Sequence, residues 1–497
     1  MFIDVRLVII VCRTDKMRGL TFILAAVLAL GSVSASQKRI VCYVGTWAVY
    51  RPGDGKFDID HIDPYLCTHV IYSFVGLSGN KVTLLDSWRD LPDGGGLDGF
   101  KKINALRQVN PSLKTLVAIG GWNQRSEKYS TMSSTAESRE EFANDAVAFV
   151  KKYGFDGFDI DWEYPANAAQ GGVPADYVNY VELLKIVKAK FEKEGLILSA
   201  AVAAAESTAS QSYNILEMSK YLDFINIMAY DFYGSFSSGL GMNAALKPGD
   251  SDTGNHRQLN IDACVNYWIK SGAPKEKLNL GIPFYGRAFT LSNPSSNSIG
   301  SSFSGAGAAG PYTREAGMLG YNEICEMHLK EQWDIHYDEQ RCVPYAQKGN
   351  QWISFDNIDS ITQKVKFIIE LDLGGAMVWS LETDDFRGKC GKKYPLLNTL
   401  HEVLSGNEPT KPVITTQKPT STTAQPSVTT TTAAPTHPWT DKPSGSFVCP
   451  GLGNFADPES CNFYQCVHAA NGGYTAIKTQ CPSGLCWNSE KNYCDWV

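Results

Sequence analysis

Runs of apolar residues alternate with amphipathic stretches from Arg39 to about Leu404. Eight of the runs have the length of buried strands and lie at 40–47, 69–77, 114–122, 155–163, 196–204, 222–230, 278–285 and 374–380. Between several of them, charge mixes with apolar spacings of three and four, which predicts helices at 137–152, 175–192, 260–271 and 361–371. Eight alternating strand and helix units predict an α/β fold, a (β/α)8 TIM barrel.

The strand predicted at 155–163 carries an unusual row of acidic residues. Side chains alternate between the two faces of a strand, so Asp159, Asp161 and Glu163 share one face and the apolar residues between them share the other. Neighbouring carboxylates on one face lie roughly 7 Å apart. Because each negative charge opposes ionisation of the next, we expect at least one of the three to stay protonated near neutral pH.

A protonated carboxylic acid beside an ionised one suits glycosidic bond cleavage, because the departing sugar oxygen must receive a proton. The alternatives are an exposed strand edge lined with charge and a calcium site. The alternating apolar residues indicate that one face of the strand is buried, and no further calcium-loop residues follow at the expected spacing. Both alternatives are therefore disfavoured.

Six predicted strands end in aromatic or charged residues, namely Trp47, Trp122, Glu163, Tyr230 with Asp231, Tyr285 with Arg287, and Trp379. In a (β/α)8 barrel, active sites lie at the carboxyl ends of the strands. A tryptophan at one strand end is more often a packing residue than a functional one. Six such ends converging on one face of a barrel indicate a common site.

Composition divides the chain into further segments. A basic residue, an apolar run and small residues near 33–35 predict a signal peptide at 1–35, of which 1–16 is an extension that secretion does not need. The catalytic domain is predicted at 36–407, with a small α+β insertion at 288–352 between the seventh strand and its helix. The segment 408–446 is rich in Thr, Pro and Ser and predicts a linker. Six cysteines and many aromatic residues at 447–497 predict a disulfide-rich β-type domain whose exposed rings bind sugar.

Charge and cysteine content narrow the function. The formal net charge is only -7 over 497 residues, with no basic stripe interleaved with aromatic residues, so nucleic acid is not an expected partner. Apart from the predicted signal peptide, no apolar run approaches the length of a membrane span, and we expect a soluble, secreted protein. Of the 13 cysteines, six precede the linker in the mature chain and six follow it, which favours disulfides. No Cys-x-x-Cys spacing occurs, so zinc is disfavoured and no metal is expected.

The sequence resembles glycoside hydrolase family 18, and within it the secreted animal chitinases that carry a C-terminal chitin-binding module of the peritrophin-A type. The family's catalytic signature is complete over 156–163, where Asp156, Gly157, Asp159, Asp161 and Glu163 occupy its fixed positions. Three further motifs agree, at 119–122 (IGGW), 228–231 (MAYD) and 281–287 (GIPFYGR). In the tail, 461–466 and 494–496 match the peritrophin-A pattern, although the chain lacks that pattern's last cysteine and has Cys486 instead.

The resemblance implies hydrolysis of chitin and chitooligosaccharides by a monomer without a cofactor. Glu163 would be the general acid and base, Asp161 would orient the substrate's acetamido group, Asp159 would share a proton with Asp161, and Tyr230 would donate to the acetamido oxygen. The residues implied to bind substrate are Tyr43, Trp47, Phe74, Gly120, Trp122, Asn123, Tyr164, Met228, Asp231, Tyr285, Arg287 and Trp379. The implied disulfides are Cys42 with Cys67 and Cys325 with Cys390, which leaves Cys264 and Cys342 as a candidate third pair.

Phe236 stands where the family commonly has tryptophan, which predicts weaker stacking on the leaving-group side. Two other functions compete with catalysis. A chitinase-like lectin would bind chitin oligomers without cutting them, but in such proteins the position of Glu163 is typically replaced. A matrix protein would use the tail to crosslink chitin, but one chitin module can anchor a chain and cannot crosslink by itself.

Overall fold

The computed structural model describes residues 38–409, 453–457, 463–468, 474–479, 485–488 and 493–496. The chain divides into two compact units, at 1–415 and 416–497, and each is described by itself. The predicted signal peptide at 1–35 lies outside the described residues, as does the predicted linker apart from its first two residues.

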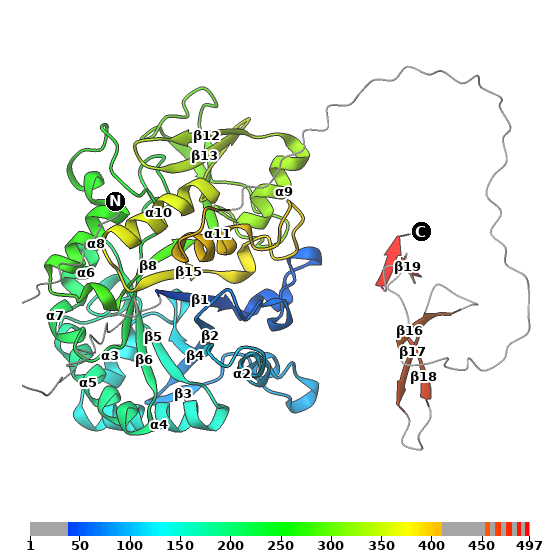
Figure 1. The fold of residues 1–497 in the computed structure, drawn as a ribbon, viewed down its shortest axis with the longest axis horizontal. Helices are drawn as coiled ribbons and strands as arrows, with labels where there is room; N and C mark the ends of the chain where they lie inside the picture. Colours follow the sequence, from blue (N-terminus) through cyan, green and yellow to red (C-terminus); the bar gives the residue numbers. More distant parts are fainter. Residues whose placement is uncertain are drawn as a thin grey trace, which may run out of the picture. The chain divides into compact units, whose positions relative to one another are not determined.

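A closed barrel of eight parallel strands forms the centre of the first unit (Figure 1). The strands follow the order β1-β15-β8-β7-β6-β5-β4-β2, and β1 pairs with β2 to close the ring. Their bounds are β1 Arg39–Gly45, β2 His69–Ser78, β4 Lys114–Gly120, β5 Gly157–Asp161, β6 Ile197–Ala203, β7 Phe224–Met228, β8 Leu278–Pro283 and β15 Gly375–Trp379. Each predicted run overlaps one of these strands, so the predicted TIM barrel is confirmed.

Helices surround the barrel (Figure 1). They are α1 Ser87–Asp90, α2 Gly99–Val109, α3 Glu127–Ser133, α4 Ala136–Tyr153, α5 Asp176–Glu194, α6 Glu206–Ser212, α7 Ile215–Met218, α8 Ile261–Lys270, α10 Ile358–Glu370 and α11 Pro395–Leu404. Local sequence fixes several ends. Thr135 caps the first turn of α4 through its side chain, and Gly154 ends that helix in the left-handed conformation that glycine adopts at little cost. All four predicted helices are confirmed to within three residues at each end.

Several barrel strands end earlier than predicted. β1 ends at Gly45 and β4 at Gly120, so Trp47 and Trp122 lie in the short 3-10 helices η1 (Thr46–Tyr50) and η5 (Trp122–Gln124) that follow these strands. Gly120 and Gly121 have φ of 124° and 84°, which takes the backbone out of the extended region. These two tryptophans of the predicted site therefore lie just beyond the strands.

Two apolar clusters make up the core of the barrel domain. The larger fills the layer between the strands and the surrounding helices, where Phe158 of β5 packs against Phe142 of α4 and Phe191 of α5. The smaller lies inside the barrel and includes Tyr43 and Phe224. This alternation follows from the period of two in a strand, because each strand presents one face to the helices and the other to the barrel interior.

Between β8 and α10 the chain forms a six-stranded antiparallel sheet with one helix, drawn in green and yellow-green in Figure 1. The strands are β9 Tyr285–Leu291, β10 Phe303–Ala306, β11 Met318–Gly320, β12 Asp334–Asp338, β13 Val343–Lys348 and β14 Gln351–Ser354, and the helix is α9 Tyr321–Glu331. The sheet has its own apolar interior around Phe289 and Trp352. The insertion predicted at 288–352 falls within this segment, between the seventh barrel strand and the helix after it.

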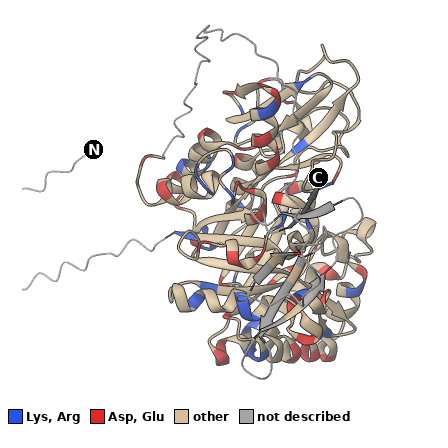
Figure 2. Ribbon diagram, turned by 90° about the vertical axis from the view of Figure 1, so that its right-hand side faces the viewer, with Lys and Arg blue, Asp and Glu red and all other residues tan. Residues whose placement is uncertain are grey.

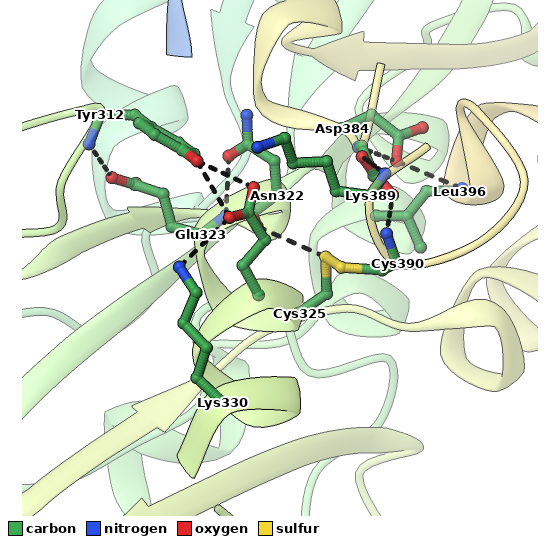
Figure 3. The surroundings of a disulfide bond; sticks show 11 residues. Tyr312, Asn322, Glu323, Cys325, Lys330, Asp384, Lys389, Cys390 and Leu396 are labelled. Atoms are coloured by element: carbon green, nitrogen blue, oxygen red, sulfur yellow. Dashed lines mark hydrogen bonds and ion pairs between the residues drawn. A yellow bond between two sulfur atoms is a disulfide. The ribbon is translucent and has the colours of Figure 1, made fainter. Parts of the chain in front are cut away.

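Two disulfides link segments that are distant in sequence. Cys42 of β1 joins Cys67 before β2, and Cys325 of α9 joins Cys390 after β15 (Figure 3). These are the two pairs that the resemblance implied. The second bond ties the insertion to the barrel beside Glu323, whose carboxylate accepts backbone N–H groups from Tyr312 and Gly320.

The third pair considered, Cys264 with Cys342, does not form. Both thiols are free. The Cys264 thiol is buried in α8 and donates to the backbone carbonyl of Gln258, whereas the Cys342 thiol lies in the turn before β13 and donates to that of Glu339. The two side chains are held by different local structures, so the expectation was wrong.

Apart from Asp457, the described residues of the second unit lie in strands. β16 Gly453–Ala456, β17 Phe463–His468 and β18 Tyr474–Thr479 form an antiparallel sheet, and β19 Leu485–Asn488 pairs with β20 Tyr493–Trp496. The disulfides predicted for this tail lie outside the described side chains.

Acidic and basic residues are interspersed around the barrel domain (Figure 2).

The remaining described strand, β3 Lys81–Thr83, forms a hairpin with β2. In the part of the chain that the structure describes, every helix is too short or too polar to cross a bilayer.

Candidate active site

Strand β5 positions the three carboxylates. Asp159 and Asp161 point into the barrel and are buried, while Glu163 lies two residues beyond the strand and is partly exposed. Trp162 faces the opposite way and packs between Tyr129 of α3 and Tyr180 of α5. The predicted division into an acidic face and an apolar face is therefore confirmed. Of the three carboxylates, Glu163 is the most exposed.

Asp159 is fixed by two hydroxyl groups inside the barrel. Tyr43 of β1 donates to Asp159 Oδ2 at 2.7 Å, and Ser199 of β6 donates to Asp159 Oδ1 at 2.5 Å. Both carboxylate oxygens thus accept a hydrogen bond. Asp161 differs, because its Oδ1 is buried and has no hydrogen-bond partner in the protein. Of these two inward carboxylates, Asp161 is the one with an unused acceptor.

The surroundings of the site raise the pKa values of its three carboxyl groups. Burial raises the pKa of Asp159 to about 6. Burial also raises the pKa of Asp161 well above its usual range, and the charges of Glu163 and Asp159 act in the same direction. For Glu163, burial raises the pKa to about 7, with a further contribution from the charge of Asp231. A protonated group near neutrality is thus present as predicted, but burial and not mutual repulsion is its main cause.

A second polar group lies beyond β7 and β8. The carboxylate Oδ1 of Asp231 accepts hydrogen bonds from the Tyr285 hydroxyl and from Arg287 Nε, both at 2.7 Å. Asp231 has a φ of 57°, and its backbone N–H donates to Asn243 Oδ1. The Tyr230 hydroxyl donates to the thioether sulfur of Met377 at 3.8 Å, a weak acceptor that a better one can replace. Burial raises the pKa of Tyr230 well above its usual range, so this hydroxyl stays a donor.

Aromatic rings gather beside these carboxylates. Trp379, at the end of β15, contacts Tyr43, Phe74 and Trp47, with ring centroids 5.6, 5.7 and 6.2 Å apart. Phe74 and Trp379 are stacked, and Trp47 is 40% exposed. Four of the residues implied to bind substrate, Tyr43, Phe74, Trp47 and Trp379, thus lie together as an apolar surface with an exposed outer edge.

The other predicted residues have different surroundings. Trp122 is 56% exposed and Asn123 is exposed in the same 3-10 helix, while Met228 and Tyr164 are partly buried. Gly120 is buried, and a Cβ atom added there would lie 1.9 Å from the carbonyl oxygen of Asp161. Its contribution is to let β4 approach β5 closely, which positions Asp161.

Sequence reasoning missed several residues that hold the site. Ser199 forms a hydrogen bond with Asp159, Asn226 with Tyr43, and Asn243 with Asp231. All three residues are buried. Ser199 and Asn226 are isolated polar residues in otherwise apolar strands, which is a signal that could have identified them.

Sequence reasoning also missed an exposed ring pair near Trp47. Tyr50 follows Trp47 in η1 and stacks on Trp88 of α1, with ring centroids 6.1 Å apart. Both rings are exposed. Trp88 does not close a predicted strand, so the argument from strand ends passed over it.

Among the described residues, a single cluster has the composition of a metal site. It consists of Cys325, Asp385 and Cys390. Its two cysteines form a disulfide, and disulfide sulfurs are not the thiolates that bind metal.

A protonated carboxyl group beside buried carboxylates and an aromatic surface, at the carboxyl end of a (β/α)8 barrel, is an arrangement for cleaving sugars by acid catalysis. The model of the glycosyl hydrolases family 18 matches residues 39–384. The chain belongs to glycosyl hydrolase family 18. It is therefore a glycoside hydrolase, and the matched segment includes β5 and Glu163.

Known relatives support this assignment. The chain is 39% identical over 398 residues to the probable chitinase 2 of Drosophila melanogaster, covering 74% of this chain and 80% of that one. It is similar to the Group IV chitinase of Ostrinia furnacalis in complex with allosamidin, with a TM-score of 0.72 and 44% identity over 75% of this chain and all of the other. It also resembles human YKL-39, a pseudo-chitinase with retained chitooligosaccharide binding, with a TM-score of 0.68 and 36% identity over 74% of this chain and all of the other.

Proposed function

We propose that the protein is a secreted chitinase that hydrolyses β-1,4-linked N-acetylglucosamine polymers and oligomers, with Glu163 as general acid and base. The observation that carries the proposal is the pKa of Glu163, raised to about 7 by burial in a site whose other two signature carboxylates lie inside the barrel. A glutamic acid in that state can protonate a departing sugar oxygen near neutral pH. The relatives described as chitinases supply the substrate class.

The positions of the other carboxylates favour attack by the substrate's own acetamido group. Asp159 and Asp161 are buried behind Glu163, and Asp231 is bonded to Tyr285 and Arg287. None is free to reach an anomeric carbon as a nucleophile. In the proposed first step Glu163 gives its proton to the glycosidic oxygen, the bond from that oxygen to the anomeric carbon breaks, and the acetamido oxygen bonds to the anomeric carbon.

The second step reverses the role of Glu163. Its carboxylate takes a proton from water as the water oxygen attacks the anomeric carbon and displaces the acetamido oxygen. The two displacements together retain the anomeric configuration. Both steps use only side chains of this chain, the substrate and water.

Two groups are placed to hold the acetamido group during these steps. The unpartnered Oδ1 of Asp161 can accept the acetamido N–H. The Tyr230 hydroxyl, which donates only to a thioether in the free protein, can donate to the acetamido oxygen instead. The surface of Trp379, Phe74 and Trp47 provides an apolar contact for the sugar ring. A glucose polymer without acetamido groups lacks the nucleophile and should not react.

A non-catalytic lectin is the second candidate, because the chain is similar to human YKL-39, described as a pseudo-chitinase. Here Glu163 is present, and its raised pKa is the property that an acid catalyst needs. We test the choice by incubating the purified protein with soluble N-acetylglucosamine oligomers and with matched glucose oligomers. Cleavage of the first alone, with the β-anomer formed first by NMR, supports the proposal. Binding without cleavage supports the lectin.

We further propose that residues 447–497 anchor the enzyme to insoluble chitin and that residues 1–35 direct its secretion. The aromatic and cysteine content of the tail supports the first role, and an apolar run followed by small residues supports the second. Truncation after residue 407 should lower activity on crystalline chitin and spare activity on soluble oligomers. An equal loss on both substrates would contradict the anchor.

A further inference from the structure

A chain of hydrogen bonds crosses the barrel interior from the amino end of β1 to Asp159. Arg39 Nε donates to Asn279 Oδ1 at 3.0 Å, and Asn279 Nδ2 donates to Asn226 Oδ1 at 2.9 Å. Asn226 Nδ2 donates to the Tyr43 hydroxyl oxygen at 2.9 Å, and that hydroxyl donates to Asp159 Oδ2 at 2.7 Å. The two asparagines pair in register on β7 and β8 and are fully buried.

Arg39, at the far end of this hydrogen-bond chain, sets its donor-to-acceptor direction. A guanidinium group has no acceptor, so Arg39 can present only a donor to Asn279. The amide oxygen of Asn279 must then face Arg39, which turns its NH2 group towards Asn226. The same reasoning turns the NH2 group of Asn226 towards Tyr43. The hydroxyl oxygen of Tyr43 is thus occupied as an acceptor, and its single proton must point at Asp159.

Arg39 itself is held in place on several sides. Its Nη2 donates to the backbone carbonyl of Glu276, and its guanidinium lies over the ring of Phe224, 5.4 Å from the ring centroid. An anchored arginine fixes the direction of every bond that follows. Arg39, Asn279 and Asn226 do not lie at the exposed aromatic surface. Replacing any of them can therefore change turnover only by changing Tyr43 and Asp159.

We infer that Arg39, Asn279 and Asn226 are positioning residues that force the Tyr43 hydroxyl to donate to Asp159. Asp159 then accepts a hydrogen bond on each oxygen, one from Tyr43 and one from Ser199. Two donated hydrogen bonds favour the ionised form of Asp159, so a proton shared by the two inward aspartates favours Asp161. This inference rests on the proposed function, in which Asp161 is the carboxyl group that contacts the substrate's acetamido group.

The substitution Asn279→Asp tests the direction without changing the shape of the chain. The introduced carboxylate would accept from Arg39 and would also require a donor from Asn226, which turns the amide of Asn226 around. The oxygen of Asn226 would then face Tyr43 and draw its proton away from Asp159. Losing one hydrogen bond to a charged group should lower kcat on soluble oligomers on the order of ten- to a hundredfold. KM should change by less than about threefold, because the chain does not touch the substrate.

Two controls separate this role from a merely structural one. Asn279→Leu removes the link but leaves Asn226 free to donate to Tyr43, so its loss of kcat should be smaller than that of Asn279→Asp. In a Tyr43→Phe background no hydroxyl proton can be redirected, so Asn279→Asp should lower kcat less than about twofold further. Thermal unfolding of each variant reports its stability separately. Should Asn279→Asp fail to fold, Asn226→Asp makes the same test, because its carboxylate can accept a hydrogen bond from the Tyr43 hydroxyl.

The outcomes are distinct. A large loss of kcat that disappears in the Tyr43→Phe background supports the inference. An unchanged kcat, or the same fold loss with and without the Tyr43 hydroxyl, overturns it. If the wild-type protein does not hydrolyse the oligomers, the proposed function fails. If it does, but Asn279→Asp leaves hydrolysis unchanged, only the role of this hydrogen-bond chain is refuted.

Discussion

The raised pKa values of the site predict a bell-shaped pH dependence for hydrolysis. Glu163 must be protonated to act as an acid, so activity should be lost as pH rises through its pKa of about 7. Asp159 must be ionised for the proton to reside on Asp161, so activity should also be lost as pH falls through the Asp159 pKa of about 6. The test varies pH and measures kcat/KM, whose pH dependence reports the pKa values of the essential acid and base in the free enzyme.

The two values set the size of the effect. With limbs at about 6 and 7, kcat/KM should peak near pH 6.5 and should be roughly twentyfold lower two pH units to either side. A glutamic acid with an ordinary pKa of about 4.3 would be protonated in fewer than about 1% of molecules at pH 6.5, compared with about three quarters of molecules for a pKa of about 7. Burial of Glu163 therefore makes the acid available at the pH where Asp159 is ionised.

The assay is the initial rate of cleavage of a soluble oligomer at low concentration from pH 4 to pH 9, at constant ionic strength. Asp231→Asn is the matched variant, because it removes the neighbouring charge that adds to the raised pKa of Glu163. Its alkaline limb should move to lower pH. A wild-type alkaline limb near pH 4.5, or an unshifted limb in Asp231→Asn, would refute the reasoning.

Three further predictions concern structure around the site. Replacing Cys325 and Cys390 together with serine opens a loop with a sequence separation of 65, and should lower the free energy of unfolding in urea by about 4 kcal/mol; a change below about 1 kcal/mol would contradict this. Gly120→Ala should lower it by about 3 kcal/mol and reduce kcat, because the new Cβ would meet the backbone of Asp161 at a φ of 124°; native stability would count against that account. Trp379→Ala should lower kcat/KM on oligomers at least about tenfold with an unchanged circular dichroism spectrum, and wild-type kcat/KM would show that its ring is not a contact surface.

Local pattern was enough to predict the barrel strands, because a buried parallel strand is an apolar run bounded by breaks. It did not place their carboxyl ends, where Gly120 and Gly121 leave the extended region in a way that residue type alone does not show. Nor did it predict the sheet order of the insertion, since β9 pairs with β14 across about sixty residues and such pairing depends on the whole fold.

The site was predictable where its chemistry lies within one strand, as for Asp159, Asp161 and Glu163. Residues that act on this strand from elsewhere, such as Ser199, were missed, because Ser199 and Asp159 are 40 positions apart and only the closed barrel brings them together. The cause of the raised pKa values was also misjudged. Spacing suggested repulsion between carboxylates, whereas burial, which needs the complete structure, is the larger effect for Glu163.

The most direct test of the account compares the purified protein with its Glu163→Gln variant on soluble N-acetylglucosamine oligomers, with oligomer binding measured by calorimetry. Glutamine keeps the shape of the side chain and cannot donate a carboxyl proton. We predict turnover by the wild-type protein and a loss of about a hundred- to ten-thousandfold in the variant, with oligomer binding retained. Turnover by Glu163→Gln within about tenfold of the wild type would contradict the central role of Glu163.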